Sequence, residues 1–134
     1  MDETKKIDLK NTEVRELNRM LQKRDGNNFN YFNIINPMGA HAIATGLDNE
    51  IDVLIDGHVG YYCAGMNQQS SVTINGNAGV GVAENMMSGK VVVKGDASQS
   101  AGATGHGGLL VINGNASARC GISMKGIDLS LIHI

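Results

Sequence analysis

The chain has 134 residues, one proline, two cysteines and a formal net charge of −2, which is the size of one soluble domain. The near-neutral charge lacks the basic surplus of a nucleic-acid-binding surface, and no apolar run approaches the roughly 18 residues of a membrane span. Residues 1–10 are charged and contain no secretory signal, so the sequence predicts a cytoplasmic protein with free thiols. With 18 glycines and only 4% aromatic residues, buried area is expected to come from repetition.

Residues 11–26 predict one α-helix. Asn11 or Thr12 is the expected N-cap and Gly26 the stop signal. Its apolar face consists of Val14, Leu17 and Leu21. We expect this helix to cover the first coil of the repeat that follows, because the exposed end of a repeat invites aggregation.

A weak first coil of the repeat is traced in residues 33–47. The alignment places three of its residues 20 positions before their equivalents in the next coil, namely Ile35, Asn36 and Ala44 before Ile55, Asp56 and Ala64. The remaining coils carry a stronger signal. Four glycines recur with a 19-residue period and no insertions: Gly57, Gly76, Gly95 and Gly114.

Aliphatic residues precede each of these glycines by two and by four positions. The nearer column is Ile55, Ile74, Val93 and Ile112, and the farther one is Val53, Val72, Val91 and Leu110. A period of two is that of a strand. The other face is polar, with Asp56, Asn75, Lys94 and Asn113 before the glycine and His58, Asn77, Asp96 and Asn115 after it.

Strands that repeat in this way can pair with one another when they stack in parallel about 4.8 Å apart. The sequence therefore predicts an all-β fold, a β-helix with 19-residue coils. The recurring glycines are expected at sharp corners with positive φ, and the amides of Asn75 and Asn113 in a hydrogen-bonded ladder. The rest of each coil predicts a second turn region of small residues. One column is Ala64, Ala83, Gly102 and Gly121, and another is Gly60, Gly79, Ser98 and Ser117.

The repeat breaks at the end of the sequence. The next corner glycine falls at position 133, which is His133. We therefore divide the chain into an N-terminal segment with one helix (1–30), a β-helix domain (31–128) and an irregular end (129–134), interpreted as a truncation or junction; an irregular C-terminal strand is the alternative.

The residues that bear chemistry are too far apart for a catalytic or metal site. Cys63 and Cys120 are three coils apart, about 14 Å, which is too far for a disulfide or a shared zinc ion, so they are interpreted as buried spacers. His58 and Asp96 are two coils apart, about 10 Å, against the roughly 3 Å of a catalytic pair. The sequence therefore predicts no catalytic, cofactor-binding or metal-binding residue.

Several turn residues are candidates for surface contacts instead. His106 is expected to be exposed, and His41 has no second ligand at a useful spacing. Tyr61 and Tyr62 form either an exposed contact patch or the filling of a wider coil, and the Met86–Met87 pair either fills a gap or serves an interface. The segments GATGHGG and SGKV match neither the dinucleotide-binding nor the phosphate-loop spacing.

The repeated aliphatic-x-G-x-[AV]-G segments, preceded by TEVRELNRML and GAHAIATGL, resemble the GXGXG domain of the glutamate synthase large subunit. Stand-alone versions are subunits of glutamate synthase-like and N-methylglutamate synthase-like complexes. The resemblance covers about residues 7 to 128. The residues matching the family motif are the structural turn glycines, Gly57, Gly76, Gly95, Gly114, Gly60 and Gly79, whereas Ser98 and Ser117 depart from it.

The resemblance implies a single-stranded right-handed parallel β-helix with a capping helix and no catalytic residues. It implies a non-catalytic scaffold or interface subunit, or a fragment of one, in a glutamine-using, FMN-dependent synthase complex, so whether the chain counts as part of an enzyme stays open. The implied partners are an FMN-binding synthase subunit and a glutamine amidotransferase subunit, with FMN and iron–sulfur clusters in those partners and no cofactor in this chain. Two alternatives are a β-helix like that of formylmethanofuran dehydrogenase and a self-contained binding module.

Overall fold

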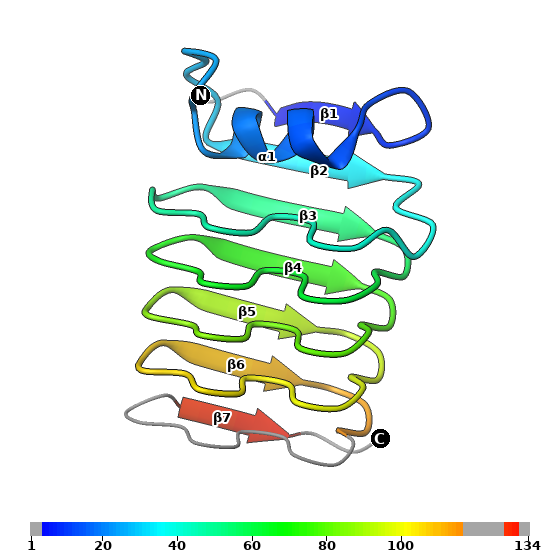
Figure 1. The fold of residues 1–134 in the computed structure, drawn as a ribbon, viewed down its shortest axis with the longest axis vertical. Helices are drawn as coiled ribbons and strands as arrows, with labels where there is room; N and C mark the ends of the chain where they lie inside the picture. Colours follow the sequence, from blue (N-terminus) through cyan, green and yellow to red (C-terminus); the bar gives the residue numbers. More distant parts are fainter. Residues whose placement is uncertain (1–3, 117–127, 132–134) are drawn as a thin grey trace.

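The computed structural model describes residues 4–116 and 128–131 and shows a parallel β-helix (Figure 1). Seven parallel strands form one sheet in sequence order. They are β1 (Thr4–Asp8), β2 (Tyr31–Ile35), β3 (Asp52–Asp56), β4 (Ser71–Asn75), β5 (Lys90–Val93), β6 (Leu109–Ile112) and β7 (Asp128–Leu131), and one helix, α1 (Val14–Leu21), lies between β1 and β2. Each coil contributes one strand and returns on one side of the sheet, so the chain winds in a right-handed sense (Figure 1).

The register from β3 to β7 confirms the 19-residue period. Val72 pairs with Val91, Val91 with Leu110 and Leu110 with Leu129, each one period further along the chain. Strand β7 continues this register to Leu131 and so crosses the boundary expected at residue 128. Four residues with predicted turn, spacer or corner positions lie outside the described residues, namely Ser117, Cys120, Gly121 and His133.

The inward columns form the core. Ile34, Ile55, Ile74, Val93 and Ile112 stack through five strands with no exposed surface. Phe32 begins the neighbouring column, and Val53, Val72, Val91 and Leu110 continue it at 2% exposure or less. Burying each such side chain contributes about 1.5–3 kcal/mol, so a short repeat with small turns acquires a continuous core.

The returning half of each coil is held by left-handed residues at alternate positions. In the second coil these are Tyr62, Ala64 and Met66, with φ of 59°, 57° and 57°. Their N–H groups bond the neighbouring coils, to Val80, Ile43 and Glu84 carbonyls at 2.8, 2.9 and 2.7 Å. Just after the corner glycines, isolated parallel bridges also join neighbouring coils, through Val59, Ala78, Ala97 and Ala116. The predicted small-residue column therefore lies in a tightly turned segment with its own inter-coil hydrogen bonds.

The positive φ predicted for the corner glycines is wrong at three of four positions. Gly57 has a φ of +135°, but Gly76, Gly95 and Gly114 do not lie in the left-handed region. Instead, the structure leaves no room for a side chain at these three positions. A Cβ at Gly114 would lie 2.6 Å from the carbonyl oxygen of Gly95, and one at Gly95 would lie 2.8 Å from that of Gly76. Each of these three glycines packs against the corner glycine of the preceding coil.

Glycine is required at positions 60 and 79 for the same steric reason. A Cβ at Gly79 would lie 2.7 Å from the carbonyl carbon of Gly60, and one at Gly60 would overlap the ring of His41. The polypeptide backbones of neighbouring coils thus touch directly at these turns, which a sequence pattern alone does not reveal.

The N-terminal segment adds a strand that the sequence pattern did not predict. Strand β1 pairs with β2 from Thr4 opposite Tyr31 to Asp8 opposite Ile35. Helix α1 then takes the place of the returning segment and buries Leu17 and Leu21 completely, as expected for a cover. It is shorter than predicted, and its N-cap is Glu13, which makes no side-chain capping bond; the expected caps, Asn11 and Thr12, precede it.

The weak first coil is confirmed, but its alignment needs correction. In the strands Ile34, and not Ile35, pairs with Ile55, so the offset is one longer than expected. In the returning segment Ala44 and Ala64 share the left-handed conformation, with φ of 59° and 57°, and their offset of 20 is as expected. The first coil therefore carries one additional residue in each of its two turns.

Candidate functional site

The polar column after the corner glycines forms a hydrogen-bonded ladder between side chains and backbone. The N–H of Asn77 donates to Nδ1 of His58, the N–H of Asp96 to Oδ1 of Asn77, and the N–H of Asn115 to Oδ1 of Asp96, each at 2.8 Å. His58 and Asp96 thus bind different coils and do not form a catalytic pair. The ladder uses the polar groups to join successive coils.

Asp56 has a similar structural role in the column before the glycines. Its two carboxylate oxygens accept hydrogen bonds from Asn33 Nδ2 at 2.9 Å and Asn75 Nδ2 at 3.3 Å. These two bonds, the Asn33 bond first, hold the pKa of the Asp56 carboxyl below its usual value of 3.8. The ladder of stacked amides expected at Asn75 is replaced here by an amide–carboxylate bond.

Cys63 is an inert spacer, as the sequence predicted. The side chain has no exposed surface, and burial raises the pKa of its thiol to about 12. A thiol in that state is neither a nucleophile nor a metal ligand near neutral pH. Among the residues that the structure describes, no three His, Cys, Asp or Glu side chains lie close enough to hold a metal ion.

The aromatic turn residues lie on the surface. Tyr61 and Tyr62 are 52% and 50% exposed, so they form the exposed patch and do not fill the coil. The ring of His41 packs on Tyr61 with centroids 4.5 Å apart, and its Nδ1 accepts the Tyr61 N–H at 2.7 Å. His106 is exposed, as expected.

The two methionines of the Met86–Met87 pair differ in burial. Met86 is fully buried and fills a gap, whereas Met87 is 44% exposed. Gly108 gives Met86 its space, since a Cβ there would lie 2.7 Å from the Met86 methyl carbon. Of this pair, Met87 is therefore the one accessible for a contact with another molecule.

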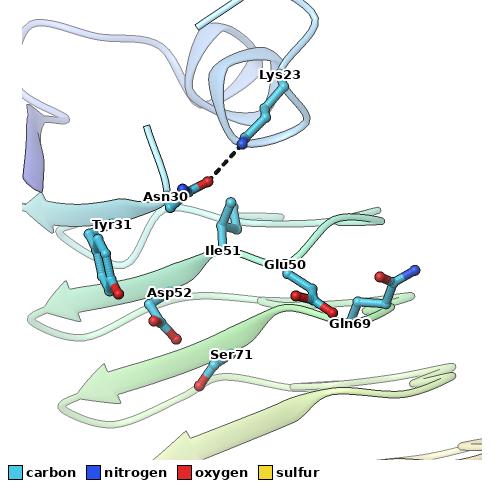
Figure 2. A pocket seen from close by; sticks show the side chains of 8 residues that line it. All are labelled: Lys23, Asn30, Tyr31, Glu50, Ile51, Asp52, Gln69 and Ser71. Carbon is cyan, nitrogen blue, oxygen red and sulfur yellow. Dashed lines mark hydrogen bonds between the residues drawn. The ribbon is translucent and has the colours of Figure 1, made fainter. Parts of the chain in front are cut away.

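A polar groove of about 640 Å³ lies at the starts of β2, β3 and β4 (Figure 2). Its lining residues are Lys23, Asn30, Tyr31, Glu50, Ile51, Asp52, Gln69 and Ser71. Lys23, which follows α1, donates from Nζ to Asn30 Oδ1 at 2.9 Å across one wall. The sequence did not predict this groove, because its residues come from separate parts of the chain and share no motif.

The groove offers several groups that can bind a ligand. An ammonium, two carboxylates, a phenol, two amides and a hydroxyl can hydrogen-bond a polar ligand. No histidine or cysteine is among its lining residues. The groove is a candidate binding surface.

The fold and these sites define a single-stranded parallel β-helix whose polar columns bind coil to coil. The curated Protein GlxC of Rhizobium meliloti (strain 1021) is 61% identical to this chain over 60 residues, which are 44% of this chain. The chain matches only 26% of the length of GlxC. No family model matches the chain, and no solved structure matches it. In the described residues no helix is long and apolar enough to cross a membrane.

Proposed function

We propose that this chain is a non-catalytic scaffold or interface subunit, or a segment of one, in a glutamate synthase-like complex. The similarity to Protein GlxC supports a relationship to glutamate synthase-related proteins. The β-helix supports it at the level of architecture, because the resembling domain is itself a β-helix. The assignment to the GXGXG domain in particular is part of the proposal.

The observation that carries the proposal is that the side chains of the polar columns form hydrogen bonds between coils. The side chains of His58, Asn77 and Asp96 each accept a backbone N–H from the next coil, and Asp56 is held between two asparagines. Side chains committed to joining coils favour a rigid support over a reaction centre. Chemistry is therefore assigned to other subunits.

The proposed partners are a glutamine amidotransferase subunit and an FMN-binding synthase subunit, with FMN and iron–sulfur clusters bound by the partners. The test is co-purification of the tagged chain from its source cells. We expect the eluate to contain flavin, to include a glutamine amidotransferase by mass spectrometry, and to transfer the amide nitrogen of labelled glutamine. An isolated chain that itself binds FMN or hydrolyses glutamine would contradict the non-catalytic role, and a chain that elutes without either partner would contradict the complex.

The groove at the starts of β2 to β4 favours a second candidate, a self-contained binding module. Its exposed Tyr31 and its carboxylates and amides suit a polyhydroxylated ligand. Screening a glycan array with the wild type and with Tyr31→Ala tests this candidate. Binding that is lost in Tyr31→Ala supports the module, and an array without any bound glycan rejects carbohydrate as its ligand.

A further inference from the structure

The outer face of the sheet is open on the side opposite the returning segments (Figure 1). Its middle column is more apolar than the sequence pattern predicted, with Leu54 40% exposed and Val92 and Val111 half-buried. A shallow hollow of about 500 Å³ on this face is lined by Leu54, Thr73 and Lys94 among others. A flat face of this kind can pack against another sheet about 10 Å away.

On this face, charges of opposite sign occupy equivalent positions on the two sides of β4. Strand β3 presents Asp52 and Asp56, whereas β5 presents Lys90 at one end and is followed by Lys94. The register aligns Asp52 and Lys90 on Ser71. Acidic groups thus lie one strand before β4 and basic groups lie one strand after it, at matching heights along the strands.

From this arrangement we propose that the outer sheet face binds a second copy of the same chain. The two-fold axis runs along β4 and lies between the two sheets. That rotation places β3 of each copy over β5 of the other, so that Asp52 faces the second copy's Lys90 and Asp56 faces its Lys94. The contact is self-complementary, as a two-fold interface requires.

The same rotation matches the uncharged residues. Leu54 lies over Val92 of the second copy, and Tyr31, which is 42% exposed, lies over Leu109. A two-fold axis perpendicular to the strands would instead place β3 over β3, with Asp52 near Asp56 and Lys90 near Lys94. Like charges in an interface disfavour that orientation, so the charges select the first one.

The size of the face sets the expected strength of the dimer. The seven strands, spaced about 4.8 Å apart, span about 29 Å, and about five residues of 3.3 Å each span about 16 Å, which gives roughly 500 Å² per copy. A total of about 1,000 Å² is at the low end of specific interfaces. We therefore expect a weak dimer in measurable equilibrium with the monomer. This self-association is independent of the proposed function.

A charge exchange tests both the face and the axis. Asp52→Lys and Lys90→Glu each place like charges opposite one another in both halves of the homodimer. Sedimentation velocity of the full chain should show a monomer–dimer equilibrium for the wild type, weakened at least about tenfold in either variant. An equimolar mixture of the two variants should dimerise as the wild type does, because both contacts are then between opposite charges.

Gln99→Lys is the matched control, since this exposed residue lies in a returning segment away from the face and should leave the equilibrium unchanged. Circular dichroism verifies that each variant folds. If Asp52→Lys or Lys90→Glu does not fold, the single variant Asp52→Asn or Lys90→Gln replaces it. Each of these neutral variants should weaken the dimer by a smaller factor. A wild type that stays monomeric up to about 1 mM, equal association in all variants, or a mixture that does not recover would overturn the proposal.

Discussion

Alanine occupies a strained backbone conformation in the returning segments. Ala64 and Ala83 have φ of 57° and 56°, where the equivalent residue one coil later is Gly102. For a residue with a Cβ this region costs roughly 1–2 kcal/mol. Inter-coil bonds offset that cost, because the N–H of Ala64 and that of Ala83 each donate to a carbonyl of the preceding coil at 2.9 Å. The small size of this column was predictable from the sequence, and the left-handed conformation was not.

The side chain of Asn77 is expected to stabilise the corner through its single acceptor oxygen. Asn77→Ala removes the acceptor for the Asp96 N–H and should lower the free energy of unfolding by roughly 0.5–1.5 kcal/mol. Chemical denaturation measures this difference. Asn77→Asp keeps an acceptor at that position and should lose less than half as much; equal losses in the two variants would contradict the ladder.

Gly79 is expected to be intolerant of any side chain. Gly79→Ala brings a Cβ against the backbone of Gly60 and should destabilise the protein by about 1–3 kcal/mol through overpacking. Ser98→Ala is the matched control, because Ser98 occupies the same column one coil later and already has a Cβ. Thermal melts that show similar small shifts for both variants would reject the steric explanation.

Strands with the uninterrupted period were predictable, and β1 was not. The 19-residue spacing identified β3 to β6 because aliphatic pairs recur at fixed positions. Thr4 and its partner Tyr31 are separated by more than one such period, because a helix replaces the shorter returning segment. Only Ile7 of β1 is buried, so the alternation that identifies a strand is nearly absent there.

The link between β2, β3 and β4 through Asp56 should depend on pH. Because hydrogen bonds lower the folded-state pKa of Asp56 below 3.8, its contribution is fully present above that pH and is lost as the pH falls through the lower, folded value. Solvent screening limits the contribution to roughly 0.5 kcal/mol. Between about pH 6 and about pH 2 the wild type should therefore lose more stability than Asp56→Asn.

Urea denaturation at the two pH values measures this difference. Asn33→Ala removes the shorter of the two side-chain hydrogen bonds to Asp56 and should reduce the pH effect while the carboxyl remains in place. A pH dependence that is identical in the wild type, Asp56→Asn and Asn33→Ala would show that the inter-strand bonds do not stabilise the charged carboxylate.

In the whole molecule each strand contacts its sequence neighbours in the sheet, as in other linear repeat proteins. The core and the polar ladders therefore transmit a perturbation from one coil to the next. The candidate groove belongs to this scale too, because it is formed where separate coils and the end of α1 meet. Its residues have no common spacing in the sequence, which is why only the folded arrangement revealed it.

A cavity under the capping helix should destabilise the nearest coils most. Leu17→Ala removes a fully buried side chain and should cost about 2–5 kcal/mol. In native-state hydrogen exchange the loss of protection should be largest in β1 and β2 and should decrease towards β6. Arg15→Ala, on the exposed side of the same helix, should change protection little, and an equal loss in every strand would contradict propagation between neighbours.

The unbroken 19-residue register from β3 to β7 makes the length of the molecule adjustable in fixed steps. Removing any stretch of one full period from this region joins two equivalent positions, so every column stays continuous and the rod shortens by about 4.8 Å. Duplicating such a stretch lengthens it by the same step. The number of repeats thus sets the distance between two molecules bound at the opposite ends of the β-helix.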